Sequence, residues 1–278
     1  PVLWNAENPQ LYTQTLSLNV DGSPADTLPE RPFGFREAWV ENGEFRLNGL
    51  KTRYRMLTNP RLEHAAFANP RAAEQYVSGL KHLNFDTVRF NPNIMMNSSS
   101  LNAREYLRAC DRLGVYNLFP MPPYDNDEMS LYREGVEKFF EHYGQYTSII
   151  MWYTDFNTCH YQRNQDPYYL NDTEYLPERV IPPRRKAMTA ERTIRALDST
   201  REVFQHAGGN SGKIFTSMNY QSYGTPLQEQ EDWPKIWSAN HTQPLMVVES
   251  GFPYPFQFLY FDGPKENWLF AENASRFF

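Results

Sequence analysis

The chain has 278 residues, of which 40% are hydrophobic, 15% aromatic and 22% charged, and its formal net charge is -6. A chain of this size and apolar content can bury a large core without relying on disulfide bonds. The negative net charge and the scattered basic residues argue against nucleic acid or an anionic membrane as the main partner. No apolar stretch approaches the roughly 20 residues of a membrane span, so we expect no membrane insertion.

The two cysteines, Cys110 and Cys159, form neither a metal-ligand spacing nor a disulfide framework. Cys110 lies in a helical pattern, where a small buried hydrophobic residue is expected. No other spacing indicates a metal or a cofactor, and we expect neither. The chain begins at Pro1 without a signal peptide, which we interpret as a fragment of a longer protein whose compartment these residues do not reveal.

The first 40 residues differ in pattern from the rest. Residues 11–20 alternate as a half-buried strand, residues 21–24 form a turn, and residues 29–32 break the strand pattern. This pattern is typical of the edge of a β-sandwich domain.

From residue 44 the pattern changes, beginning with a hairpin over residues 44–50 that has Asn48-Gly49 as its type I′ turn pair. Strands then alternate with helices. We expect strands over residues 52–57, 85–91, 115–120, 148–157, 203–206, 214–220 and 244–249, and helices over residues 71–83, 102–113, 129–143, 182–197 and 227–238. This alternation predicts an α/β fold with a parallel sheet, and seven strands in series predict a (β/α)8 TIM barrel. An eighth strand is not evident, so we expect the barrel to be incomplete at its carboxyl end.

Polar side chains end several of these strands, and the carboxyl ends of barrel strands are where ligands bind. Tyr153, Asp155 and Asn157 share one face of the fourth predicted strand by the period of two. Glu249 ends the seventh after a purely apolar run, where a partly desolvated carboxylate is costly unless it is paired or used. Arg89, at the end of the second, is its expected partner.

Each of these residues also has a structural interpretation. The fourth strand could be an ordinary core strand with a polar exit, and Glu249 could form a simple salt bridge with Arg89; the salt bridge is compatible with function, because an arginine keeps a neighbouring carboxylate ionised. Other polar or aromatic residues end the fifth and sixth strands, where they could contact a carboxylate or substrate hydroxyls, or simply pack. They are His206, Asn219, Tyr220 and Tyr223.

Seven short motifs, taken together and in order, resemble glycoside hydrolase family 2. They are residues 4–12, 33–37, 45–49, 83–90, 110–114, 148–152 and 196–201. The resemblance implies an immunoglobulin-like domain edge over residues 1–40 and a catalytic TIM barrel over residues 41–278. Members are retaining β-glycosidases, such as β-galactosidases, β-glucuronidases and β-mannosidases, that use two glutamates.

The resemblance places Glu249 at the nucleophile, with Arg89 and Tyr220 holding it ionised and oriented. The implied sugar contacts are Asn91, Asn93, His206 and Asn219, and Trp152 would line the pocket floor. The expected partner is an oligosaccharide or polysaccharide, and a homo-oligomer is compatible with the family. The resemblance favours a periplasmic or extracellular location.

One departure concerns the general acid/base. The family has a glutamate where this chain has Asn157, and an amide cannot supply a proton at neutral pH. Three explanations remain: an acid supplied from a loop, Asp155 acting from deeper in the barrel, or a site that has lost hydrolysis and only binds glycan. The loop candidates are Asp125, Asp127, His160, Asp166 and Glu174.

Overall fold

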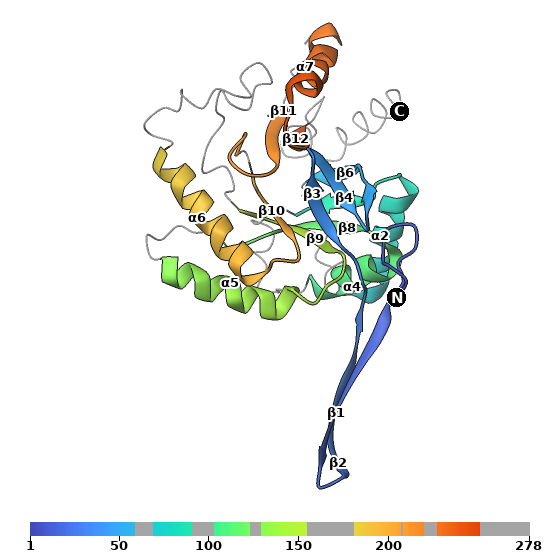
Figure 1. Ribbon diagram of the computed structural model, residues 1–278. Coiled ribbons are helices and arrows are strands. Elements are labelled where there is room, and N and C mark those ends of the chain that lie inside the picture. Colours follow the sequence, from blue (N-terminus) through green and yellow to red (C-terminus); the bar gives the residue numbers. More distant parts are fainter. Residues whose placement is uncertain are drawn as a thin grey trace, which may run out of the picture.

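The computed structural model describes residues 1–58, 69–90, 103–122, 129–154, 181–206, 208–219 and 227–250. Its centre is a parallel sheet of five strands (Figure 1). These are β6 (Met56–Thr58), β7 (Thr87–Arg89), β8 (Tyr116–Pro120), β9 (Ile149–Thr154) and β10 (Glu202–Gln205). The helices that follow the first four strands in the sequence are α2 (Pro70–His82), α4 (Arg104–Leu113), α5 (Met129–Tyr143) and α6 (Ile181–Leu197).

The order of the five strands across the sheet is their order in the sequence, and every neighbouring pair is parallel. A doubly wound sheet reverses direction at a switch point, whereas a barrel adds each strand on the same side. Two further strands, β11 (Phe215–Asn219) and β12 (Leu245–Ser250), form a separate parallel pair, and α7 (Leu227–Asn240) lies between them in the sequence. The predicted α/β fold with a parallel sheet is confirmed; the described strands do not close into a ring, and the barrel stays a prediction.

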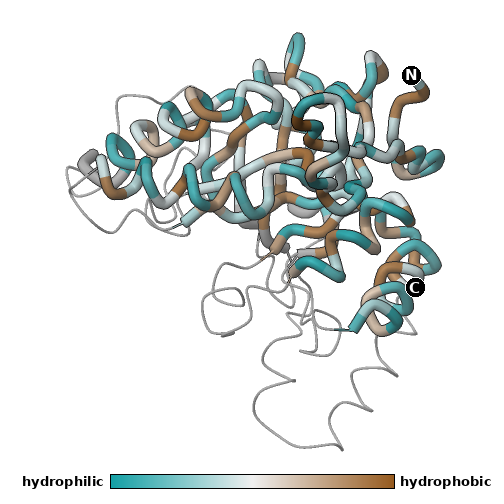
Figure 2. Tube along the Cα trace, turned by 90° about the horizontal axis from the view of Figure 1, so that it is seen from below, coloured by the Kyte–Doolittle hydropathy of each residue, from teal (hydrophilic) through white to brown (hydrophobic). Residues whose placement is uncertain are grey.

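The sheet has an apolar layer on each face. On one face, which we call the helix-side core, strand residues such as Val88, Phe119 and Trp152 pack with residues of α2, α4, α5 and α6. Figure 2 shows the complementary pattern in the helices, whose hydropathy alternates along their length as expected for helices that bury one face. Cys110 lies fully buried in this layer, as predicted.

On the opposite face, which we call the inner core, Leu118, Tyr153 and Phe204 of the central sheet pack with Met246 and Val248 of β12. The two separate sheets therefore share one apolar layer. Residues of the strands mostly alternate between the two layers, which is the period of two of a strand covered on both faces. In β9 both Ile150 and Met151 enter the inner core, at the register shift between β8 and β9.

The helix ends follow local sequence signals. The side chain of Asn69 caps α2 by accepting from the backbone N–H of Arg71 at 2.9 Å, and Pro70 occupies the first turn. Gly114 ends α4 with φ 77°, and a Cβ at this position would lie 2.6 Å from the carbonyl oxygen of Ala6. Glycine is therefore required both for the left-handed conformation and for the close approach of the amino-terminal segment.

The amino ends of the strands are covered by a three-stranded antiparallel sheet of β3 (Ala38–Glu41), β4 (Glu44–Leu47) and β5 (Leu50–Lys51). The predicted turn at Asn48-Gly49 is confirmed, with φ angles of 51° and 86°. Strand β3 was not predicted, and it contains the predicted domain boundary between residues 40 and 41. Its Val40 N–H donates to Glu202, the first residue of β10, at 3.3 Å.

Before this sheet, β1 (Tyr12–Val20) and β2 (Ser23–Phe33) form a hairpin that projects from the body (Figure 1). The expected break at residues 29–32 is wrong, because β2 continues to Phe33. Among the described strands β2 pairs only with β1, so prolines on its free edge lose no hydrogen bond, and a register shift next to Gln14 accommodates Pro29. The hairpin is exposed rather than half-buried, with Leu18 58% exposed.

Candidate active site

Three side chains meet at the carboxyl ends of β7, β9 and β10. Arg89 Nη1 lies 3.2 Å from His206 Nδ1, and the Arg89 guanidinium lies over the Tyr153 ring, 5.6 Å from its centroid. The rings of Tyr153 and His206 are 6.1 Å apart. All three side chains are buried, with at most 1% exposure. The expected convergence of strand-end residues is thus seen for Arg89 and His206.

The strand pattern explains why these residues share a face. Val88 belongs to the helix-side core and Phe90 does too, so Arg89 between them turns to the inner face. Tyr153 is a member of the inner core. On β10, Phe204 faces inward, and His206 follows it at a spacing of two.

Tyr153 joins the ends of two strands. Its hydroxyl donates to the carbonyl oxygen of Phe90, the residue after β7, and its ring stacks on Phe204 with centroids 5.3 Å apart. The hydroxyl is thereby committed to the main chain. We interpret Tyr153 as a residue that fixes the position of Arg89 rather than as a substrate contact.

The contact between Arg89 and His206 constrains the tautomer of the imidazole. An arginine guanidinium has only donors, so the Nδ1 that faces it must accept. This hydrogen bond requires the tautomer of His206 that carries its hydrogen on Nε2. A protonated His206 would lose this acceptor and place a second positive charge beside Arg89.

The structure places the backbones of Glu249 and Asn219 at the same end of the β11–β12 pair. Met218 is opposite Glu249, and Asn219 is opposite Ser250. The register shifts by one residue immediately before Glu249, which is the kind of bulge that often re-aims side chains next to active sites.

Most of the other predicted site residues lie outside the described residues. They are Asn91, Asn93, Asp125, Asp127, Asp155, Asn157, His160, Asp166, Glu174, Tyr220 and Tyr223. Their roles stay predictions, and so does the identity of the general acid.

The expectation that Trp152 lines the pocket floor is wrong. Its ring packs in the helix-side core against Phe119, and its indole Nε1 donates to Asp198 at 2.7 Å. The same period of two that brings Tyr153 to the inner face places its neighbour Trp152 on the other face.

Asp198 and Arg201 form an ion pair with a structural role. The sequence analysis named these residues only as members of the motif over residues 196–201. Arg201 pairs with Asp198 at 2.8 Å, lies over the Trp152 ring at 5.1 Å, and donates to the carbonyl oxygen of Ile149 at 2.8 Å. Burial alone would raise the pKa of Asp198, but Arg201 and hydrogen bonds from Thr200 and Trp152 lower it to about 2. This ion pair secures the start of β9, the strand that carries Tyr153.

Within the described ranges, no group of three or more histidine, cysteine or acidic side chains could hold a metal ion. None of the helices in these parts of the chain is long and apolar enough to cross a bilayer.

Comparison with known proteins shows which family the chain resembles. Residues 1–36 match the family model described as Glycosyl hydrolases family 2. The β-galactosidase of Thermoanaerobacterium thermosulfurigenes is 22% identical over 259 residues, which are 91% of this chain and 33% of that protein. β-Galactosidase 2 of Enterobacter cloacae is 25% identical over 273 residues, 90% of this chain and 23% of that protein. The chain is glycoside hydrolase family 2-like. It spans a third or less of the length of these two relatives.

Solved structures share the fold of this family 2-like chain. Bacteroides uniformis β-glucuronidase superposes with a TM-score of 0.63 at 19% identity, over 90% of this chain and 31% of that one. A family 2 β-galacturonidase from Eisenbergiella tayi, bound to galacturonate, gives 0.60 at 17% identity, over 90% and 44% of the two chains. At these identities the likeness concerns the fold alone.

Proposed function

We propose that this chain forms the catalytic barrel of a β-glycosidase, with Glu249 as the nucleophile. The observation that carries the proposal is the buried group of Arg89, Tyr153 and His206 at the strand ends, on the face whose apolar layer includes β12. An inward arginine at this position supplies the positive charge that keeps a partly desolvated carboxylate ionised. The relatives are β-galactosidases by name, which favours a β-linked glycan as substrate.

In this proposal the reaction proceeds in two displacements. The Glu249 carboxylate attacks the anomeric carbon as the glycosidic C–O bond breaks, and the leaving group departs as an alcohol or, from an activated aryl glycoside, as a phenolate. Water then hydrolyses the glycosyl-enzyme ester and releases the sugar and the Glu249 carboxylate. Arg89 orients the carboxylate, and His206 and Tyr153 hold Arg89. Tyr220 would assist Arg89, and Asn91, Asn93 and Asn219 would bind sugar hydroxyls.

The general acid stays open among three alternatives: a loop acid, Asp155, or none. Asn157, which stands where the family has its acid, also favours a second candidate function, a barrel that binds glycan without cleaving it. Substrates with good leaving groups distinguish the two functions, because their departure needs little protonation.

The test is hydrolysis of aryl β-glycosides with good leaving groups by the full-length protein. We expect turnover that Glu249→Gln reduces by about a thousandfold or more, since the nucleophile is removed. The matched control is Glu231→Gln, the same change at an exposed position of α7, which should leave kcat unchanged. Glycan binding without turnover in the unaltered protein would contradict the enzyme and favour the binding barrel.

A further inference from the structure

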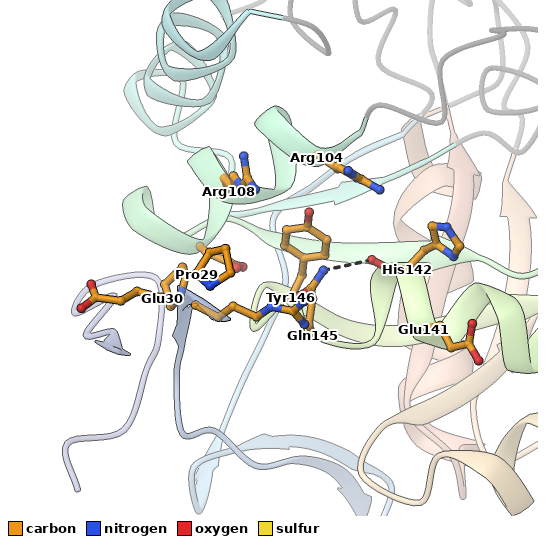
Figure 3. Close-up of a pocket in the computed structure, with 11 residues that line it drawn as sticks. Pro29, Glu30, Arg104, Arg108, Glu141, His142, Gln145 and Tyr146 are labelled. Carbon is orange, nitrogen blue, oxygen red and sulfur yellow. Dashed lines mark hydrogen bonds between the residues drawn. The ribbon is translucent and has the colours of Figure 1, made fainter. Parts of the chain in front are cut away.

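A cavity of about 390 Å³ lies away from the carboxyl ends of the strands (Figure 3). It is lined by residues 29–32 of β2, by Arg104, Arg108 and Asp111 of α4, and by residues at the end of α5 and just after it. Tyr146, one of these, precedes the first residue of β9. The cavity therefore lies toward the amino end of that strand, opposite the end that carries the candidate active site.

Arginines from two elements surround this cavity. Arg104 and Arg108 are one helical turn apart on α4, so they project from the same face, and Arg31 comes from β2. Arg108 donates to Glu105 through Nη1 at 2.6 Å, which leaves its other nitrogens available. Arg31 and Arg104 form no ion pair with any residue that the structure describes. Such a concentration of guanidinium groups contrasts with the chain's net charge of -6.

The Tyr146 hydroxyl adds a neutral donor at the centre of the cavity. In Figure 3 it points toward the side on which Arg104 and Arg108 lie. Burial raises the pKa of Tyr146. The charges of Arg108 and Arg104 partly oppose this change and those of Asp111 and Glu105 reinforce it, so the phenol stays protonated. The hydroxyl makes no hydrogen bond to the described part of the chain.

The carboxylates that line the cavity point away from its centre or are hydrogen-bonded to the main chain. The carboxylates of Glu30 and Glu141 point away from the Tyr146 ring in Figure 3. Asp111 Oδ1 accepts the backbone N–H of Ser148 at 2.7 Å. The groups that face the centre are thus mainly hydrogen-bond donors.

We propose that this cavity is a second glycan-binding site, which takes a carboxylate-bearing sugar residue. Guanidinium forks match a carboxylate in geometry and charge, and the Tyr146 hydroxyl and the Gln145 amide can bind sugar hydroxyls. The volume lies within the range of about 300–1,000 Å³ found for small-molecule sites. The anionic group follows from the arginines; the choice of a sugar rests on the glycosidase function proposed above.

The test is a ligand-observed NMR titration of the full-length Glu249→Gln protein with glucuronate, with glucose and inorganic sulfate as comparison ligands. We expect Arg104→Gln/Arg108→Gln to weaken one glucuronate-binding event by about ten- to a hundredfold, and Tyr146→Phe to weaken it less, without loss of fold. The charge-matched control Arg133→Gln/Arg192→Gln alters two exposed arginines of α5 and α6 and should bind as before.

Unchanged binding in the double variant would overturn the proposal, and so would glucose or sulfate binding as tightly as glucuronate. Hydrolysis is measured separately, with Glu249 intact. Loss of glucuronate binding at the arginines in a protein that never hydrolyses aryl glycosides would support this site and contradict the proposed function. Hydrolysis of aryl glycosides by the unaltered protein, together with unchanged glucuronate binding in the double arginine variant, would support the proposed function and contradict this site.

Discussion

Arg89 is the residue around which the candidate active site is arranged. Its guanidinium is fully buried and faces an imidazole nitrogen, which must be an acceptor. A buried charged donor that loses its acceptor costs about 1–3 kcal/mol or more. The role of His206 can therefore be separated from bulk and burial by substitutions that keep or remove an acceptor.

We predict that His206→Asn retains most of the activity and stability of the full-length protein, because the asparagine Oδ1 can still accept from Arg89. His206→Leu should lower the free energy of unfolding by about 1–3 kcal/mol and reduce kcat/KM, because Arg89 loses an acceptor. Urea denaturation and aryl glycoside kinetics measure the two effects. Equal losses in both variants would show that His206 does not act by accepting from Arg89.

At the level of secondary-structure elements, a second buried group, Asp111, connects α4 to the start of β9. It accepts the N–H of Ser148 at 2.7 Å, yet burial outweighs its hydrogen bonds and raises its pKa to about 6. In an unfolded chain an aspartate titrates near pH ~4. Because the folded pKa is the higher one, the folded state binds the proton more tightly and loses stability as the pH rises from about 4 through 6.

We predict that this one group costs about 3 kcal/mol of unfolding free energy between pH 4 and pH 7. Asp111→Asn should remove that part of the pH dependence, since an amide does not titrate, while Asp26→Asn in the exposed hairpin should not change it. Urea denaturation of the three proteins at both pH values gives the comparison. The same pH dependence in Asp111→Asn as in the unaltered chain would contradict this account.

At the same scale, the sequence predicted most elements because their signals are local. The helix over residues 129–143 has the bounds of α5, and each strand of the parallel sheet overlaps a predicted one, although β6 begins four residues later than the strand predicted over residues 52–57. Strand β3, of four residues, was missed. The turn at Asn42-Gly43, with positive φ at both residues, was the signal that could have revealed it.

The candidate site was less predictable than the fold. Strand-end position and the period of two predicted Arg89 and His206 as site residues. The same period places Trp152 on the opposite face of its strand, which became evident only from its packing in the helix-side core. The contact between Arg89 and His206 joins residues 117 positions apart, and no local pattern reports such a distance. The arginine-lined cavity likewise combines three separate segments.

On the scale of the whole molecule, the hairpin of β1 and β2 has one apolar face. Leu16, Leu18 and Val20 alternate along β1 and are each more than half exposed, and Leu28 lies opposite Leu16. We propose that residues 1–40 are the edge of a β-sandwich, whose other strands would cover this face.

We predict that Leu18→Asp destabilises the full-length protein by about 2–4 kcal/mol, because it would bury an unpaired charge. Asn19→Asp introduces the same charge on the opposite face and should change the unfolding free energy by less than about 0.5 kcal/mol. Thermal or urea unfolding compares the two. A Leu18→Asp variant as stable as Asn19→Asp would show that the face is open to solvent.

The amino-terminal segment makes long-range contacts that form late in folding. Trp4 donates to the carbonyl oxygen of Asp111, Arg36 donates to that of Thr147, and Val40 donates to Glu202, across 107, 111 and 162 residues of chain. Contacts so distant in sequence form slowly, because a long loop must close before they are gained. On the ribosome this segment would thus be synthesised before the residues it contacts and would dock only after they have emerged, and until then Trp4 would remain accessible to chaperones and proteases.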